Sequence, residues 1–97
     1  MKPVIIDAEA ENELSESVKF YERRQTGLGL SFERAVRQAI KRIQAAPEHY
    51  PLKKGGTQRL VMERFPFVIH YIELEKTIWV LAFAHTSRKP GYWRHRL

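Results

Sequence analysis

The chain has 97 residues, no cysteine and a net charge of +6 at neutral pH. A chain of this length builds one modest core, and without cysteine neither a disulfide nor a thiolate metal site can stabilise it. The apolar run before Asp7 is too short for a signal peptide, and no later run is long enough to span a membrane, so we expect a cytoplasmic protein with no membrane partner. The excess positive charge favours an anionic partner, which could be nucleic acid, a nucleic-acid machine or an acidic protein segment.

The N-terminal segment predicts a strand followed by a helix. Val4-Ile5-Ile6 is a β-branched run, and the Asp7 that follows it is a good helix N-cap. From residue 8 to about residue 24 apolar residues recur on one stripe, with acids near the start and arginines near the end. This charge distribution complements the helix dipole and supports the first helix.

A second helix follows a glycine-containing break. Gly27-Leu28-Gly29 interrupts the pattern, and apolar residues then recur at helical spacing from Phe32 to Ile43 until Ala46-Pro47 ends them. Two helices in tandem predict a hairpin. The outer face of its second helix is basic, which indicates either a solvated surface or a contact surface. Its basic residues are Arg34, Arg37, Lys41 and Arg42.

The C-terminal half predicts three strands. Residues 47–57 hold two prolines and two glycines and predict a loop, and strands follow at about 59–63, 67–72 and 78–84. The last strand is apolar on both faces, as expected of a central strand covered on both sides. Residues 1–97 are therefore predicted to form a single α+β domain of order β-α-α-β-β-β. Both helices pack on one face of an antiparallel sheet, and only the short C-terminal tail is left to cover the other face.

Several fragments of the sequence occur together in a fixed order. They are Gly27-Leu28-Gly29 before Phe32, Pro47-Glu48-His49-Tyr50-Pro51, Arg59, Phe65-Pro66-Phe67-Val68-Ile69-His70-Tyr71, and His85-Thr86-Ser87-Arg88-Lys89-Pro90-Gly91-Tyr92-Trp93-Arg94. In this order and spacing, over nearly the full chain, they resemble the RelE/ParE toxin superfamily, closest to ParE-like plasmid-stabilisation proteins. The final pattern, His-x-x-Arg-x-Pro-x-Tyr-Trp, is the most specific of them.

The resemblance implies the toxin component of a type II toxin–antitoxin system. Such a toxin is neutralised by direct binding of its cognate ParD-like antitoxin in a hetero-oligomer. Within the superfamily, RelE-like members cut messenger RNA in the ribosome, whereas ParE-like members are described as poisons of DNA gyrase without hydrolytic chemistry. RelE-like members crowd basic residues at the end of the last strand, where this chain has Thr86 and Ser87. We therefore expect a stoichiometric gyrase inhibitor, without a cofactor and without sequence-specific nucleic-acid binding of its own.

The alternative is a ribosome-dependent messenger endonuclease (mRNA interferase). Attack by a ribose 2′-hydroxyl needs a proton acceptor, a proton donor and cations that stabilise the charge on the phosphate. Candidates for these roles are His85, Tyr92, Arg59, Arg88, Lys53 and Lys54. A strand-end histidine and solvated surface cations are the simpler interpretation. His49 and His70 show no ligand spacing with acids, so no metal site is predicted.

Two binding surfaces are predicted besides this chemistry. The tail mixes aromatic and basic residues without an acid and is the candidate target-binding segment, comprising Arg88, Lys89, Tyr92, Trp93, Arg94 and Arg96. Its rings could instead cover the open sheet face, and both roles are compatible if the rings point inward and the arginines outward. The antitoxin segment is expected along the hairpin, at Leu14, Val18, Tyr21, Arg34, Arg37 and Lys41.

Overall fold

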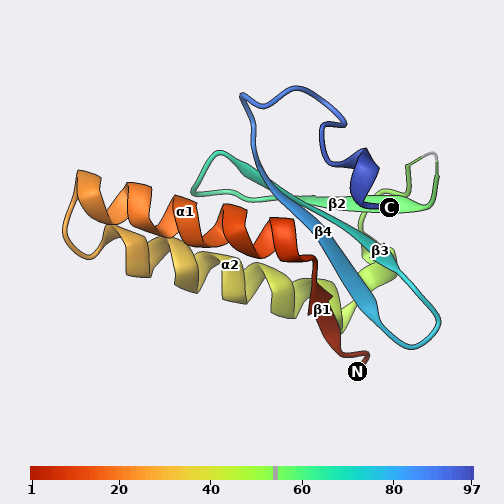
Figure 1. The fold of residues 1–97 in the computed structure, drawn as a ribbon. Coiled ribbons are helices and arrows are strands. Elements are labelled where there is room, and N and C mark those ends of the chain that lie inside the picture. Colours follow the sequence, from red (N-terminus) through yellow and green to blue (C-terminus); the bar gives the residue numbers. More distant parts are fainter. Residues whose placement is uncertain (54) are drawn as a thin grey trace.

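The computed structural model, which describes residues 1–53 and 55–97, has the predicted α+β order (Figure 1). Its elements are β1 (Val4–Ile6), α1 (Ala8–Arg24), α2 (Leu28–Ala45), the 3-10 helix η1 (Pro47–His49), β2 (Thr57–Val61), β3 (Phe67–Glu73), β4 (Ile78–His85) and the 3-10 helix η2 (Arg94–Arg96). Asp7 caps α1 as predicted, because its carboxylate accepts a hydrogen bond from the Glu9 amide. Helix α2 begins at Leu28, four residues before the first apolar position of the predicted pattern.

The two helices approach each other closely at their connection. A Cβ atom at Gly29 would lie 2.6 Å from the Val18 carbonyl oxygen, so only glycine fits at this crossing. The Glu22 carboxylate accepts hydrogen bonds from the amides of Gly27 and Gly29 at 3.0–3.1 Å. Gly27 has a positive φ of 88°, which glycine adopts without strain. The connection is therefore tight enough to place α2 antiparallel beside α1.

The sheet has the strand order β1-β4-β3-β2. Strands β2, β3 and β4 pair antiparallel, as predicted, whereas β1 runs parallel to β4, with Val4 opposite Ile78. The sequence predicts an antiparallel sheet throughout, and β1 departs from it because the chain must pass directly from β1 into α1, which lies against β4. Figure 1 shows both helices on the same side of the sheet.

The main core lies between the helical hairpin and the sheet. Four rings make its centre: Tyr21, Phe32, Phe65 and Phe67 pack with centroid separations such as 4.9 Å between Phe32 and Phe67. Fully covered aliphatic side chains surround these rings, among them Val36, Ala39, Ile43, Ile69, Ile78 and Val80. Burial of this apolar area stabilises the fold more than any other interaction in it.

The opposite face of the sheet carries a second, smaller apolar cluster, built from Leu81, Ala82 and Trp93. The tail folds back across this face, so that Trp93 is only 4% exposed and its ring stacks on His70 with centroids 4.5 Å apart. This is the second covering that the apolar faces of β4 predicted.

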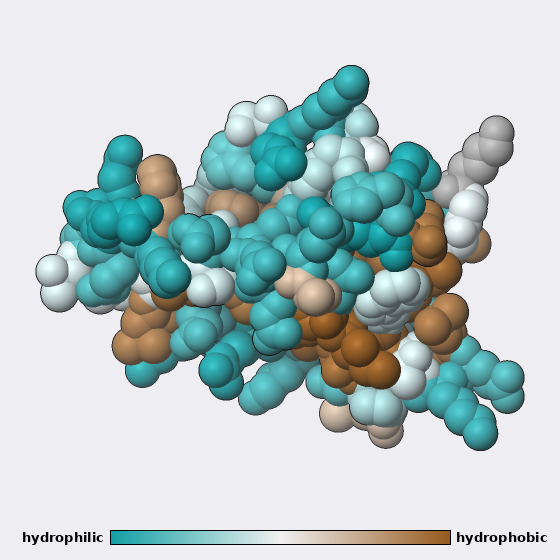
Figure 2. All heavy atoms as spheres, viewed as in Figure 1, coloured by the Kyte–Doolittle hydropathy of each residue, from teal (hydrophilic) through white to brown (hydrophobic). Residues whose placement is uncertain are grey.

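The surface is unevenly polar. In Figure 2 hydrophilic side chains cover the hairpin and the tail, and a hydrophobic area lies below them in the region of β1 and β4. Ile5 of β1 is 53% exposed there. Within the described residues, neither helix combines the length and the apolar character that crossing a bilayer requires.

Candidate functional site

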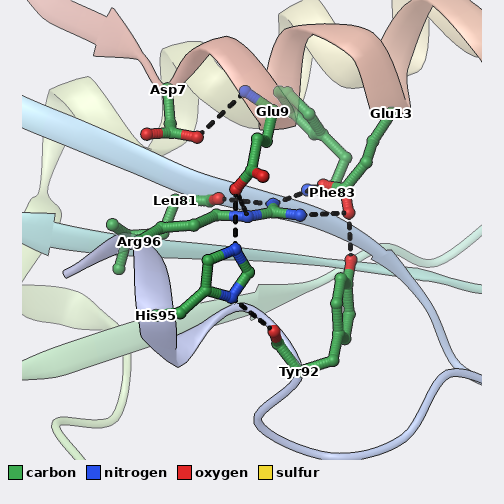
Figure 3. Close-up of polar contacts among 8 residues, drawn as sticks. All are labelled: Asp7, Glu9, Glu13, Leu81, Phe83, Tyr92, His95 and Arg96. Atoms are coloured by element: carbon green, nitrogen blue, oxygen red, sulfur yellow. Dashed lines mark hydrogen bonds and ion pairs between the residues drawn. The ribbon is translucent and has the colours of Figure 1, made fainter.

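The end of the tail is fastened to helix α1 through Arg96. Its side chain is only 7% exposed, and its Nε donates to Glu9 Oε2 at 2.8 Å. Its Nη1 donates to Glu13 Oε1 and to the Leu81 carbonyl oxygen, both at 2.9 Å, and its Nη2 donates to Glu13 Oε2 at 3.0 Å. Figure 3 shows this guanidinium lying between the two glutamates. The contact is a charge-assisted, two-oxygen pair, the strongest kind of side-chain hydrogen bonding.

Glu13 is the centre of this arrangement, which we call the tail clamp (Glu9, Glu13, Tyr92, His95 and Arg96). Besides Arg96, its carboxylate accepts hydrogen bonds from the Phe83 amide, at 3.1 Å, and from the Tyr92 hydroxyl. Burial, followed by this hydrogen bond to Glu13, raises the pKa of Tyr92. The hydrogen bond to Glu13 likewise raises the pKa of Arg96. The clamp therefore holds Tyr92 protonated and Arg96 charged (Figure 3).

His95 completes the clamp on its exposed side. Its Nε2 lies 2.9 Å from Glu9 Oε2 and its Nδ1 lies 3.0 Å from the Tyr92 carbonyl oxygen. The hydrogen bond with His95 is the main reason that the pKa of Glu9 is lowered. Sequence reasoning missed Glu9, Glu13 and His95 as clamp residues. The one signal in the sequence was the complementary charge of two segments: the first helix begins with acidic residues, and the tail is basic and contains no acid.

The predicted target-binding residues divide into two groups. Arg88, Lys89 and Arg94 are exposed, whereas Trp93 is buried and Tyr92 is half-buried. Arg96 was expected to point outward, but it turns toward α1 because Glu13 and the Leu81 carbonyl group supply partners there. In this structure Arg96 holds the tail, and only the other three cations face solvent.

A hollow of about 460 Å³ opens between the tail and the sheet. It brings together most of the predicted nuclease set, although those residues come from the 47–57 loop, β2, β4 and the tail. The members that line it are Lys53, Arg59, His85, Arg88 and Tyr92. Lys54, the sixth candidate, lies outside the described residues.

The proton-transfer pair of that set is not assembled in the hollow. The Tyr92 hydroxyl donates to Glu13, and its raised pKa disfavours a proton-accepting role. His85 Nδ1 lies 2.7 Å from Ser87 Oγ and 3.0 Å from the Ser87 amide nitrogen, a local contact of the turn after β4. The hollow therefore offers positive charge and the imidazoles of His70 and His85, while the Tyr92 hydroxyl is bound to Glu13.

His70 forms part of the hollow's wall. Burial and, to a smaller extent, the neighbouring charges of Arg59 and Arg94 together lower its pKa to about 4, against an opposing contribution from Glu13. His70 is consequently neutral at physiological pH.

The predicted antitoxin-binding residues differ in their exposure. Arg34, Arg37 and Lys41 are exposed along α2. The apolar members, Leu14, Val18 and Tyr21, are half-buried and pack against the main core, so they offer only part of their surface.

A second depression, of about 580 Å³, lies beside α1 and has a largely apolar lining. Its lining includes Phe20, which is 48% exposed, with Phe67 and Phe83 from the sheet and Arg23 and Arg88 among its cations. Among the described residues, no three histidine, aspartate or glutamate side chains gather in a way that would hold a metal ion.

Known proteins share both the sequence pattern and the fold. The family described as "ParE toxin of type II toxin-antitoxin system, parDE" matches residues 4–90. A chain of the chromosomal ParDE TA system from P. aeruginosa is similar in structure, with a TM-score of 0.74 and 20% sequence identity, over 88% of this chain and 96% of that chain. No curated protein matches the sequence.

Proposed function

Because the chain belongs to the family of ParE toxins of type II toxin–antitoxin systems, we propose that it arrests growth by binding and poisoning DNA gyrase in the cytoplasm, and that a cognate ParD-like antitoxin neutralises it by direct binding. The observation that carries the non-enzymatic part is the tail clamp: the hydroxyl that a nuclease would need is bound to Glu13. The exposed cations Arg88, Lys89 and Arg94 are then the target contacts, presented by a tail that Arg96 fixes in place. The toxin acts stoichiometrically.

The gyrase proposal is tested with purified protein. The toxin should block supercoiling or trap cleaved DNA, and the double variant R88Q/K89Q should weaken this effect. The matched control is R34Q/R37Q, which removes the same charge from the outer face of α2. Unchanged supercoiling at doses that arrest growth would contradict the proposal.

One observation favours the messenger endonuclease as a second candidate: the hollow gathers Lys53, Arg59, Arg88 and His85 around one space. The test uses H85A combined with Y92F, because phenylalanine keeps the ring and removes only the hydroxyl. The endonuclease requires that toxicity and cleavage of ribosome-bound messenger both disappear while the protein stays folded. Retained toxicity of this variant excludes the candidate.

The antitoxin is proposed to bind along the hairpin and into the depression beside α1. Phe20 supplies exposed apolar area, and Arg23 and Arg88 supply positive charge. The lining also holds Glu13 and Glu16, which are paired with Arg96 and Lys19. An acidic segment with apolar side chains fits such a surface and would fold as it binds. Antitoxin binding should protect amides of residues 8–46 from hydrogen exchange, and F20E should weaken the complex. Unchanged exchange in these residues would place the antitoxin elsewhere.

A chain that binds its antitoxin but no longer harms the cell is distinguished by a simple experiment. Induced expression should arrest growth, and co-expression of the antitoxin should restore it. Normal growth on induction, with soluble folded protein, would reduce the function to antitoxin binding alone.

A further inference from the structure

The charged side chains that line the hollow between the tail and the sheet are all basic. Five basic side chains line it and no carboxylate does among the described residues; they are Lys53, Arg59, Arg88, Lys89 and Arg94. None of the five forms an ion pair within the described part of the chain. The α1 acids Glu9 and Glu13 are already paired with Arg96 and His95. Within the described residues, no ion pair therefore neutralises the five cations of the hollow.

Two of these guanidiniums are held in position before any ligand arrives. Arg88 lies 3.8 Å above the centroid of the Tyr92 ring, and Arg94 lies 5.2 Å from that of Trp93. Both rings are themselves fixed, Tyr92 by Glu13 and Trp93 by stacking on His70. Cations that are ordered in advance lose less side-chain entropy when they bind an anion.

The low pKa of His70 reports on the same electrostatic field. Part of its depression comes from Arg59 and Arg94, which repel a proton on the ring. An anion seated between these arginines would compensate them and raise the pKa of His70. The ring is therefore a built-in probe of occupancy.

The chemistry of the walls distinguishes among anionic ligands. Strands β3 and β4 are both interior to the sheet, so a peptide could not add a strand to either of them. The edge strand that lines the hollow is β2, and Leu52 already bridges to it at Gln58. Trp93 is buried and stacked on His70, and two guanidiniums lie near the Tyr92 ring, so neither ring presents a free face for base stacking. What remains is a set of hydrogen-bond donors for phosphate oxygens. Such donors contact the sugar-phosphate backbone of a nucleic acid and do not read its base sequence.

We infer that this hollow binds the phosphodiester backbone of single-stranded nucleic acid, independently of base sequence. A hollow lined by cations can follow the backbone of a flexible single strand, whereas a duplex is stiff and convex. The inference goes beyond the proposed function and does not depend on whether gyrase or the ribosome is the target. It concerns a binding step of the toxin alone.

The test measures fluorescence anisotropy of labelled single-stranded oligodeoxynucleotide and oligoribonucleotide, using the full chain across a range of salt concentrations. R59Q/R88Q removes two charges from the hollow, and R34Q/R37Q removes two from the outer face of α2. The hollow variant should bind roughly tenfold more weakly and lower the salt dependence by about two phosphate contacts, with less than about a twofold effect for the control. All four arginines are exposed, so both variants are expected to fold, which circular dichroism checks.

Competitors separate the sources of the anion. A mononucleotide or inorganic phosphate should displace the oligonucleotide only at far higher concentration, because each makes a single phosphate contact. Equal potency would identify a free-nucleotide or phosphate site and overturn the inference. Polyglutamate is the competitor for an acidic protein segment. If it binds as tightly as the oligonucleotide, and R59Q/R88Q abolishes its binding, the hollow is a site for acidic protein and the inference is overturned.

A second readout does not depend on affinity. Titration of the His70 ring by nuclear magnetic resonance should show a higher pKa when the oligonucleotide is bound. Equal weakening by R59Q/R88Q and R34Q/R37Q, no binding of the wild-type chain at physiological salt, or an unchanged His70 titration in the bound state would each overturn the inference.

Discussion

The two faces of the sheet are covered by different means. The hairpin covers one face with an almost wholly apolar interface centred on four aromatic rings, whereas the tail covers the other with a small apolar cluster and a charged clamp. Apolar packing is tolerant of partner and position, but a buried ion pair depends on each member being present. The difference indicates that the hairpin face sets the stability of the fold, and that the tail face sets the position of the exposed cations Arg88, Lys89 and Arg94.

The largest effect is expected on the hairpin face. Phe32→Ala should lower the free energy of unfolding by about 4 kcal/mol, because the ring is fully buried among Tyr21, Phe65 and Phe67. Urea denaturation measures the change. Phe20→Ala, at a ring that is 48% exposed, is the matched control and should cost far less. Similar losses in the two variants would mean that the hairpin face does not dominate stability.

The next effect is expected at the clamp. Glu13→Ala leaves the 7% exposed Arg96 side chain without its main partner and should cost about 3 kcal/mol, unless the tail swings out to hydrate the charge. In either case trypsin should cut the tail faster than in the wild-type chain. Glu16→Ala is the control, since Glu16 forms only an exposed contact with Lys19 on the same helix. Wild-type proteolysis of the Glu13 variant would show that the clamp does not hold the tail.

The third effect is a pH dependence of stability. The pKa of His70 is about 4 in the fold and about 6.5 when the chain is unfolded, so the unfolded chain binds more protons between these values. The stabilising contribution of neutral His70 is full above pH 6.5 and is lost as the pH falls toward 4, by about 2 kcal/mol once the partial exposure of the ring to solvent is allowed for. His70→Gln should flatten this part of the stability curve relative to the wild-type chain. Parallel curves for the two proteins would contradict the assignment.

The smallest effect is expected at the exposed edge of the clamp. Glu9 is 54% exposed, so its contacts with His95 and Arg96 are screened by solvent. Glu9→Gln should change stability only slightly, and the change should vanish at high salt. A loss as large as that of Glu13→Ala would mean that the two glutamates act as one unit.

Hydrophobic periodicity correctly predicted the elements whose buried residues recur at a regular spacing within one segment of the chain. The stripe from Phe32 to Ile43 and the apolar run of β4 led directly to the hairpin and to a central strand, as the structure shows. The apolar pattern did not locate the start of α2 at Leu28, because the Glu22 carboxylate, rather than a side chain at the N-cap, accepts hydrogen bonds from the amides of Gly27 and Gly29. Sequence spacing carries no information on such a contact.

The clamp was beyond the reach of sequence reasoning for a different reason. Glu9 is an ordinary acid of a first helical turn, and Glu13 follows it on the same helix. Their pairing with Arg96 joins residues 87 and 83 positions apart. The same pairing explains why Arg96 does not point outward with Arg88 and Arg94, a distinction that composition cannot make.

The parallel pairing of β1 with β4 has a consequence for how the chain reaches its fold. Val4 cannot pair with Ile78 until β4 has left the ribosome. The strand that is synthesised first therefore stays unpaired until the last strand of the sheet is available. Contacts between such distant segments slow folding, since a long loop must close before any of them forms. The hairpin can assemble early, but the cationic hollow forms only after the tail has docked. The hollow is therefore among the last features of the fold to form during synthesis.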